Sequence, residues 1–307
     1  MTNLKELQEM PLEWKIIIAQ ARITEWYHYF NGNVYVAFSG GKDSTVLLHL
    51  VRATFPDVPA VFCDTGLEFP EVKEFVKSFD NVEIIKPHQS FRQVIEIYGY
   101  PVISKETAKR LKYAKVWKDK DTEKYNLYVH GKMVNGKPVY RGNSIPKKWM
   151  HLIDAPFKIS ADCCLVMKKR PFYRYGKRTG RVPYVGLMAE EGDLRAKVWK
   201  EHGCNAFDLK HPQSQPLSFW TDKDIWEYIH KYNLDYCKLY DMGYRRTGCM
   251  YCMFGLQFDE VDRFETMRLT HPKIYDYCMR DKEDNGLGIK QVLDYVNMNM
   301  DKQQRLW

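Results

Sequence analysis

Residues 34–51 read VYVAFSGGKDSTVLLHLV, and this stretch decides the fold class. Its first five residues are apolar and β-prone, which is typical of a strand buried in a parallel sheet. Two adjacent glycines and a lysine then lead into a run with Val46, Leu47, Leu50 and Val51 at helical spacing. A buried strand that passes through a short glycine loop into a helix predicts an α/β unit.

The rest of the chain repeats this alternation. Apolar runs predict further strands at residues 60–62, 82–85 and 182–187. Helical spacing predicts helices over residues 12–30, 45–53, 71–79, 221–232 and 289–298, with Thr221 as an N-cap, whereas residues 235–254 read as a loop. This order implies a doubly wound, mostly parallel sheet.

A basic insertion at about residues 104–149 interrupts the pattern. Residues 101–150 hold 13 Lys and Arg against 4 Asp and Glu, in a chain whose net charge is +8. Partial alternation over residues 124–140 and the turn signal Asn135-Gly136 predict a β-hairpin there. Basic side chains alternate here with two aromatic rings, so the cations could contact the phosphates of a nucleic acid and the rings could stack on its bases. A solvated lysine-rich surface is an equal alternative. These side chains are Lys105, Lys109, Arg110, Lys112 and Lys115, with Tyr113 and Trp117.

The loop after the first strand is suited to binding phosphate. A helix N-terminus presents unpaired N–H groups and a positive dipole end, and glycines let the backbone approach an anion closely. Hydroxyls and a lysine add donors. The residues are Ser39, Gly40, Gly41, Lys42, Asp43 and Ser44. The pattern is not Gly-x-x-x-x-Gly-Lys-Ser/Thr, so it is not the usual P-loop of NTPases.

Bulk properties favour a soluble cytoplasmic protein. No apolar run approaches the roughly 20 residues that a membrane span needs, and the first 13 residues carry acids and no signal-peptide core. We therefore expect no membrane partner and a reducing compartment for the eight cysteines.

Two cysteine pairs stand at motif spacing. Cys249-x-x-Cys252 can place two thiolates on one metal, and Cys163-Cys164 is a rarer adjacent pair. Thiolates accept zinc as well as iron–sulfur clusters, so the spacing leaves the metal open. The third interpretation of these two pairs is that the four cysteines are buried and bind no metal.

Several motifs, taken in order, resemble one family. Residues 39–44 after an apolar strand are similar to the pyrophosphate-binding loop of ATP pyrophosphatases, the PP-loop superfamily. Residues 64–71 (DTGLEFPE) look like a signature of its phosphoadenosine phosphosulfate (PAPS) reductase branch. Further matches follow at residues 163–171, 186–195, 215–226 and 239–252. The resemblance implies an adenine nucleotide alpha-hydrolase-like, Rossmann-like fold.

The resemblance also implies domains and roles. We expect an N-terminal helix (1–33), a PP-loop nucleotide-binding α/β domain (34–240) and a C-terminal Cys-x-x-Cys and helical segment (241–307). The nucleotide would contact residues 39–44 together with Asp64, Thr65, Gly66, Glu68 and Gly186. A carboxylate at Asp64 could hold a ribose hydroxyl or Mg²⁺, or could simply cap a helix. Lys42, Asp43 and Arg195 would be catalytic, although a surface arginine is the alternative for Arg195.

Adenylylsulfate reductases of the family carry both cysteine pairs and bind a four-iron four-sulfur (4Fe-4S) cluster. The resemblance therefore implies Cys163, Cys164, Cys249 and Cys252 as cluster ligands, with zinc as the alternative metal.

Two departures from the reductase pattern favour ATP. The loop is intact, and residues 298–307 lack the cysteine that attacks the sulfonucleotide in reductases. We expect ATP- and Mg²⁺-dependent adenylation coupled to sulfur transfer to a nucleic acid or a small molecule. The alternatives are reduction of PAPS or adenylylsulfate by an external thiol, and a non-catalytic nucleotide sensor that binds nucleic acid. A sulfur or electron donor protein and a homodimer are further expected partners.

Overall fold

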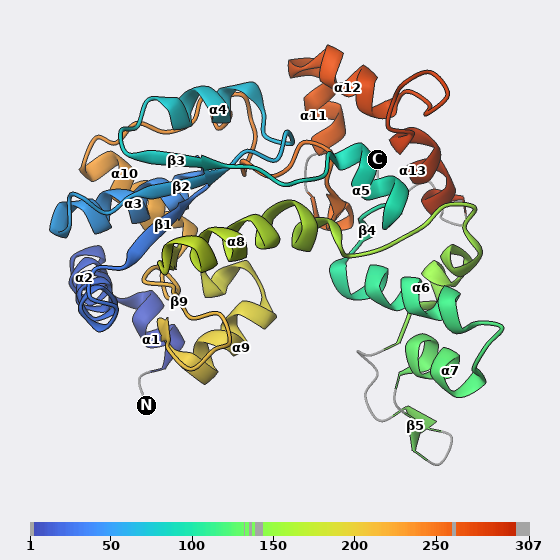
Figure 1. The fold of residues 1–307 in the computed structure, drawn as a ribbon, viewed down its shortest axis with the longest axis horizontal. Coiled ribbons are helices and arrows are strands. Elements are labelled where there is room, and N and C mark those ends of the chain that lie inside the picture. Colours follow the sequence, from blue (N-terminus) through green and yellow to red (C-terminus); the bar gives the residue numbers. More distant parts are fainter. Residues whose placement is uncertain (1–2, 132, 135–136, 139–143, 260–261, 299–307) are drawn as a thin grey trace. The chain divides into compact units, whose positions relative to one another are not determined.

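A computed structural model describes residues 3–131, 133–134, 137–138, 144–259 and 262–298 (Figure 1). The chain forms two compact units, each built from separate segments. The first unit comprises Met1–Asp64, Glu68–Pro87 and Arg170–Thr247, and the second comprises Thr65–Leu67, His88–Lys169 and Gly248–Trp307.

The first unit is a layered α/β structure. Its helices are α1 (Leu4–Glu9), α2 (Leu12–Tyr29), α3 (Lys42–Thr54), α4 (Pro70–Lys77), α8 (Arg170–Thr179), α9 (Asp193–His202) and α10 (Asp222–Lys231), with a 3₁₀ turn η4 (Ala189–Glu191). Its strands are β1 (Val34–Phe38), β2 (Ala60–Cys63), β3 (Val82–Ile85), β7 (Val182–Val185), β8 (Asn205–Ala206) and β9 (Gln213–Ser214).

These strands form one sheet in the order β3-β2-β1-β7-β9-β8. The neighbours β3-β2, β2-β1, β1-β7 and β7-β9 are parallel, and only β8-β9 is antiparallel. The chain moves outward from β1 to β3 and then crosses back to place β7 on the other side of β1. This confirms the doubly wound, mostly parallel sheet that the alternation of elements predicts.

Helices cover both faces of this sheet. On one face Tyr35 and Val61 pack with Tyr175 of α8, and the rings of Tyr35 and Tyr175 lie 4.9 Å apart in an edge arrangement. On the other face Tyr184, which pairs with Val36, donates its hydroxyl to the carbonyl of Ile23 in α2 at 2.7 Å. Because side chains alternate along a strand, the apolar run of β1 serves both layers.

A buried ion pair anchors the start of α10. Lys15 Nζ of α2 donates to Asp224 Oδ2 at 2.6 Å, and the two side chains are 2% and 9% exposed. Asp224 also accepts the N–H and the hydroxyl of Thr221, both at 2.7 Å, which confirms Thr221 as the N-cap. One carboxylate therefore orders the first turn of α10 and ties it to α2.

The second unit is mainly helical. It contains α5 (Phe91–Ile97), α6 (Lys105–Trp117), α7 (Thr122–His130), α11 (Arg263–Thr270), α12 (Pro272–Met279) and α13 (Ile289–Asn297), with a 3₁₀ helix η2 (Lys147–Asp154), a π-helical turn η3 (Leu165–Lys169) and a 3₁₀ turn η5 (Leu256–Phe258). Its short strands are β4 (Val102–Ile103), β5 (Met133–Val134), β6 (Lys137–Pro138) and β10 (Met253–Phe254), paired as β4-β10 and β5-β6.

The basic insertion differs from the prediction. Residues 124–130 belong to helix α7, which Asp121 caps by accepting the N–H of Lys124 at 2.9 Å. The antiparallel pair is limited to β5 and β6, and the predicted turn Asn135-Gly136 lies outside the described residues. The partial alternation was misleading because Tyr125, Tyr128 and Val129 also stand at helical spacing.

The other predicted helices and strands are confirmed with small shifts at their ends. Helix α3 begins three residues early, at Lys42, because Gly41 serves as its N-cap. The strand predicted over residues 182–187 ends at Val185, and the predicted loop at 235–254 contains the short strand β10 at its end. Among the described residues, no helix is both long and apolar enough to cross a bilayer.

We predict that Lys15→Met destabilises the protein by about 3–5 kcal/mol, because the substitution leaves the Asp224 carboxylate buried without its counter-charge. The midpoint of urea-induced unfolding, followed by circular dichroism, measures the loss. Lys5→Met is the matched control, since Lys5 pairs with Glu9 on the surface at 3.8 Å, and its effect should stay within about 0.5 kcal/mol. Equal midpoints for the two variants would contradict the anchoring role of Lys15.

Candidate phosphate-binding site

The candidate site lies at the carboxyl edge of the sheet, where the strand order changes direction. The loop 39–41 follows β1, and Gly186 follows its parallel neighbour β7. A Cβ on Gly186 would stand 3.2 Å from the carbonyl carbon and oxygen of Asp43 and from the N of Ser44. The end of β7 therefore passes directly against the first turn of α3. In open α/β sheets, ligands bind at the carboxyl edge where the strand order changes direction.

Hydrogen bonds within the loop hold it in one shape. The Ser39 N–H donates to Ser44 Oγ at 3.1 Å, and Ser44 Oγ donates in turn to the Gly41 carbonyl at 2.8 Å. The two serine hydroxyl oxygens are 3.0 Å apart. Gly40 adopts a φ of 72°, and a Cβ there would stand 2.9 Å from Val72 and Val76 of α4. This position therefore requires glycine on two separate grounds.

Lys42 is the central charge of the site. The residue is 5% exposed, and its Nζ lies 2.9 Å from Asp43 Oδ1 and 2.5 Å from Asp222 Oδ1 of α10. Burial lowers the pKa of Lys42, but the charges and hydrogen bonds of Asp43 and Asp222 outweigh it and raise that pKa. The ammonium is therefore charged and is shared between two carboxylates.

Tyr240 and Thr247 close the loop from a distant part of the chain. The Lys42 N–H donates to the Tyr240 hydroxyl at 3.0 Å, which satisfies the first N–H of α3. A Cβ on Gly41 would lie 2.5 Å from Thr247 Oγ1 and 3.5 Å from the Tyr240 hydroxyl. The N–H groups of Asp43 and Ser44 follow in the first helical turn, where no intrahelical carbonyl can accept them. They are the backbone donors that an anion would meet.

Arg195 brings a second cation toward the loop. It lies in the first turn of α9 and forms an ion pair with Glu191, which also accepts the Met188 N–H at 3.0 Å. Burial lowers the pKa of Arg195, the Asp43 charge opposes this, and the charge of Arg246 adds to it. The structure thus places Arg195 within electrostatic reach of the loop, together with Arg246.

The segment after β2 divides between the two units. The Asp64 carboxylate meets Lys73 Nζ at 2.8 Å and Lys86 Nζ at 4.0 Å, and the Asp64 N–H donates to the Ile85 carbonyl at 2.9 Å. Glu68 is buried in the first unit. Thr65 and Gly66 belong to the second unit. There Thr65 Oγ1 accepts the Leu67 N–H at 3.2 Å, and Gly66 has a φ of 75°.

The four motif cysteines all belong to the second unit. Cys163 is buried, and its pKa is raised by burial and by the neighbouring thiols of Cys164, Cys249 and Cys252. The π-helical turn η3 begins directly after Cys164, and such turns are frequent at functional sites. The two pairs, 85 positions apart in sequence between Cys164 and Cys249, are thus electrostatic neighbours.

These thiols form a soft donor set, which is the chemistry that zinc and iron–sulfur clusters need. Within the part of the chain that the structure describes, no group of three or more His, Cys, Asp or Glu has the arrangement of a metal site. The influence of the other three thiols on Cys163 supports the proximity of the four cysteines. Their role as metal ligands stays a prediction.

The basic side chains expected to meet nucleic acid are partly engaged within the protein. Arg110 pairs with Glu106 at 2.9 Å, and Lys112 pairs with Asp162 at 2.5 Å. Lys115 donates to the carbonyl of Ala155. Lys105 and Lys109 are exposed on α6. Some basic side chains of α6 therefore form contacts within the protein, while others are exposed on its surface.

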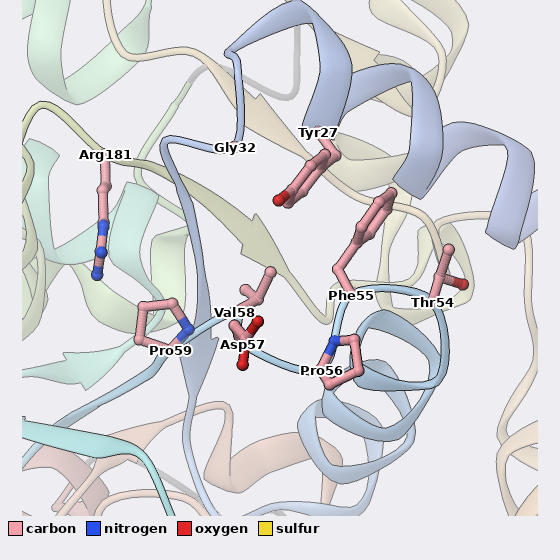
Figure 2. A pocket seen from close by; sticks show the side chains of 9 residues that line it. All are labelled: Tyr27, Gly32, Thr54, Phe55, Pro56, Asp57, Val58, Pro59 and Arg181. Carbon is pink, nitrogen blue, oxygen red and sulfur yellow. The ribbon is translucent and has the colours of Figure 1, made fainter.

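A separate cavity of about 330 Å³ lies at the opposite edge of the sheet (Figure 2). The cavity is lined by residues just before three strands: Gly32 lies two residues before β1, Pro59 directly before β2 and Arg181 directly before β7. Tyr27 and Phe55 stack beside it with ring centroids 3.7 Å apart. This cavity is distinct from the loop at the carboxyl edge.

Four residues that surround the loop were not predicted as site residues from the sequence: Asp222, Tyr240, Arg246 and Thr247. Asp222 and Tyr240 stand inside segments that carry the family resemblance, so the motifs were a signal for their position. Their partner Lys42 is 180 and 198 residues away, respectively, and a separation of this kind gives no local pattern.

We predict that Gly41→Ala destabilises the protein by about 1–3 kcal/mol, the usual effect of overpacking. The φ of Gly41 is −87°, which alanine accepts, so the cause is the contact with Thr247 Oγ1. Thermal unfolding measures the loss. Thr247→Ala in the same protein removes the clashing oxygen and should recover part of the stability. If the double variant is no more stable than Gly41→Ala, the proposed contact is wrong.

Comparison with known proteins identifies the family. Residues 33–125 and 106–254 match the model of the phosphoadenosine phosphosulfate reductase domain. The adenosine 5'-phosphosulfate reductase of Staphylococcus haemolyticus is 26% identical over 242 residues, which cover 78% of each protein. An uncharacterized protein of Methanocaldococcus jannaschii is 26% identical over 255 residues; these are 83% of this chain and 42% of that protein, so the chain spans less than half of that relative.

Among solved structures, the phosphoadenylyl-sulfate (PAPS) reductase of Candida auris in its phosphate complex aligns with a TM-score of 0.44 and 16% identity, over 80% of this chain and 91% of that one. The family match covers well over half of the chain, from the residue before β1 to the end of β10. The chain therefore belongs to the phosphoadenosine phosphosulfate reductase domain family.

Proposed function

We propose that this chain binds ATP–Mg²⁺ on the loop 39–44 and catalyses adenylation of an acceptor with release of pyrophosphate. The observation that carries the proposal is the complete loop at the N-terminus of α3, with a buried charged Lys42 and two backbone N–H groups, of Asp43 and Ser44, that have no intrahelical acceptor. A sulfonucleotide carries no pyrophosphate, whereas the α–β–γ chain of ATP supplies the extended anion that such a loop suits.

Each side chain has a role in this reaction. The acceptor attacks the α-phosphorus, the bond to the bridging α–β oxygen breaks, and pyrophosphate leaves with the electron pair. Lys42 Nζ and the N–H groups of Asp43 and Ser44 would hold the β- and γ-phosphates and stabilise the charge that develops there. Arg195, already influenced by the Asp43 charge, would add a second cation. The carboxylates of Asp43 and Asp64 are oxygen donors of the kind that Mg²⁺ takes.

We further propose that Cys163, Cys164, Cys249 and Cys252 hold a 4Fe-4S cluster. Support comes from the mutual influence of their thiols and from the π-turn that follows the first pair. A cluster of this kind supplies electron-transfer or sulfur-handling chemistry, which would couple adenylation to sulfur transfer. The acceptor would be a nucleic acid or a small molecule, and exposed Lys105 and Lys109 favour a polyanion.

Reduction of a sulfonucleotide is the second candidate. It is supported by relatives from Staphylococcus haemolyticus and Anoxybacillus flavithermus, both named adenosine 5'-phosphosulfate reductase and 25–26% identical. In that reaction the same cations would hold the α-phosphate and the sulfate. An external thiol would attack the sulfur and expel AMP from adenylylsulfate, or the 3'-phosphorylated AMP from PAPS. A second thiol would then form a disulfide with the first and release sulfite.

Turnover assays separate the two candidates. Anaerobically purified protein is incubated with ATP–Mg²⁺, PAPS or adenylylsulfate, each with a thiol donor and with tRNA or DNA. Pyrophosphate release from ATP supports adenylation. Sulfite release from either sulfonucleotide, without pyrophosphate from ATP, would replace it with the reductase.

Lys42→Ala should weaken ATP binding at least about tenfold, because it removes a charge-assisted hydrogen bond to phosphate and leaves two carboxylates unneutralised. Isothermal titration measures the affinity. Lys77→Ala, which removes an exposed lysine at the end of α4, is the matched control and should bind as the unaltered protein does. Unchanged affinity in Lys42→Ala would remove Lys42 from the site.

The cluster proposal predicts a brown protein with about four iron and four sulfide per chain. Cys163→Ser and Cys252→Ser should each lower the iron content and the visible absorbance strongly. Cys204→Ser is the control, because Cys204 lies in the first unit and accepts from Ser218 Oγ at 3.4 Å. A colourless anaerobic protein with one zinc per chain would establish the alternative metal.

A further inference from the structure

The pairing of Lys42 is unusual because its two carboxylates differ in origin and exposure. Asp43 is the next residue in the loop, so it accompanies Lys42 wherever the loop goes. Asp222 belongs to α10, and its side chain is 60% exposed, while that of Lys42 is 6% exposed. A buried cation is thus covered by a carboxylate that stands at the solvent boundary.

Backbone and neighbouring side-chain contacts at the start of α10 fix the position of Asp222. Its N–H donates to Glu190 Oε2 at 2.7 Å, which ties the start of α10 to the segment after β7. Two residues on, Asp224 is held by buried Lys15 and by the Thr221 cap. With the first turn of α10 fixed from both sides, the Asp222 carboxylate can reach Lys42 Nζ at 2.5 Å without ordering any flexible segment.

We propose that Asp222 is a built-in counter-ion for Lys42, which competes with phosphate for the ammonium and thereby limits the affinity of the loop for phosphate and polyphosphate ligands. This inference rests on the proposed function only in placing the nucleotide phosphates at Lys42. It assigns Asp222 as a residue that sets phosphate affinity.

A phosphate within hydrogen-bonding distance of Lys42 Nζ would face the Asp222 carboxylate at close range, and like charges repel. Asp222 can turn into solvent, whereas Asp43 is adjacent in sequence and less exposed. Any phosphate that reaches Lys42 must break the Lys42–Asp222 pair, so this cost lowers the affinity for phosphate and for pyrophosphate alike. Pyrophosphate and the triphosphate of ATP make more contacts with the N–H groups, the hydroxyls and Arg195, and therefore still bind more tightly than a single phosphate.

The test compares Asp222→Asn with the unaltered protein, with inorganic phosphate and inorganic pyrophosphate as probes in isothermal titration. We expect Asp222→Asn to bind phosphate about three- to fivefold more tightly, near the upper range for an ion pair with an exposed partner. Its gain for pyrophosphate should be at least as large, because the more highly charged ligand displaces the same carboxylate and is repelled by it at least as strongly. Asp222→Ala should act in the same direction, which excludes an effect specific to the asparagine amide.

Two controls separate this role from general charge and from folding. Glu227→Gln removes an exposed acid from the same helix and should change neither affinity. In a Lys42→Ala background, Asp222→Asn should give a smaller gain for both probes, because the cation for which the carboxylate and the phosphate compete is gone. Thermal unfolding of Asp222→Asn should match the unaltered protein.

Equal phosphate affinity in Asp222→Asn and the unaltered protein overturns the inference, as does a gain of the same size in Glu227→Gln. If both probes behave as expected but ATP does not bind, the counter-ion role stands and the proposed function fails. If neither probe binds any variant, the inference fails together with the phosphate site.

Discussion

The close approach of backbone segments around the N-terminus of α3 is the constraint on which the rest of the site depends. The end of β7 passes the first turn at Gly186, and Thr247 stands against Gly41. Gly40 fits against two valines of α4. No side chain beyond a hydrogen fits at these glycines without displacing a neighbour. Packing rather than a ligand therefore fixes the shape of the loop and of the helix end, and such preorganisation favours anion binding.

Electrostatics follows from this geometry. The site gathers Lys42, Arg195 and Arg246, and the first two are matched by carboxylates of the protein itself. Asp222 reaches Lys42 from the start of α10, which Glu190 ties to the segment after β7, whereas Glu191 pairs with Arg195 four residues further along the chain. A phosphate would exchange one set of charge pairs for another, so affinity depends on the difference between them and not on the cations alone.

The two compact units carry different chemistry. The first unit contains the parallel sheet and the charged loop, and the second contains the four cysteines. In the second unit the Cys-x-x-Cys segment precedes a parallel strand pair formed by residues 102–103 and 253–254. Cys164, Cys249 and Cys252 all influence the thiol of Cys163, although the two pairs are far apart in the sequence.

The sequence by itself determined the α/β class, the parallel sheet and the position of the glycine loop at residues 39–44, because strand and helix periodicities and a glycine turn are local properties of the chain. It also determined the Thr221 cap and the family, through motifs at 39–44 and 64–71. Only the tertiary structure decided what surrounds Lys42. Asp222 and Tyr240 are 180 and 198 residues distant from it, and their contacts depend on how β7 and α10 pack against α3. Part of the prediction for the basic insertion was wrong because residues 124–130 fit both strand and helix periodicity. The Asp121 cap and the packing of α7 against α6 favour the helix.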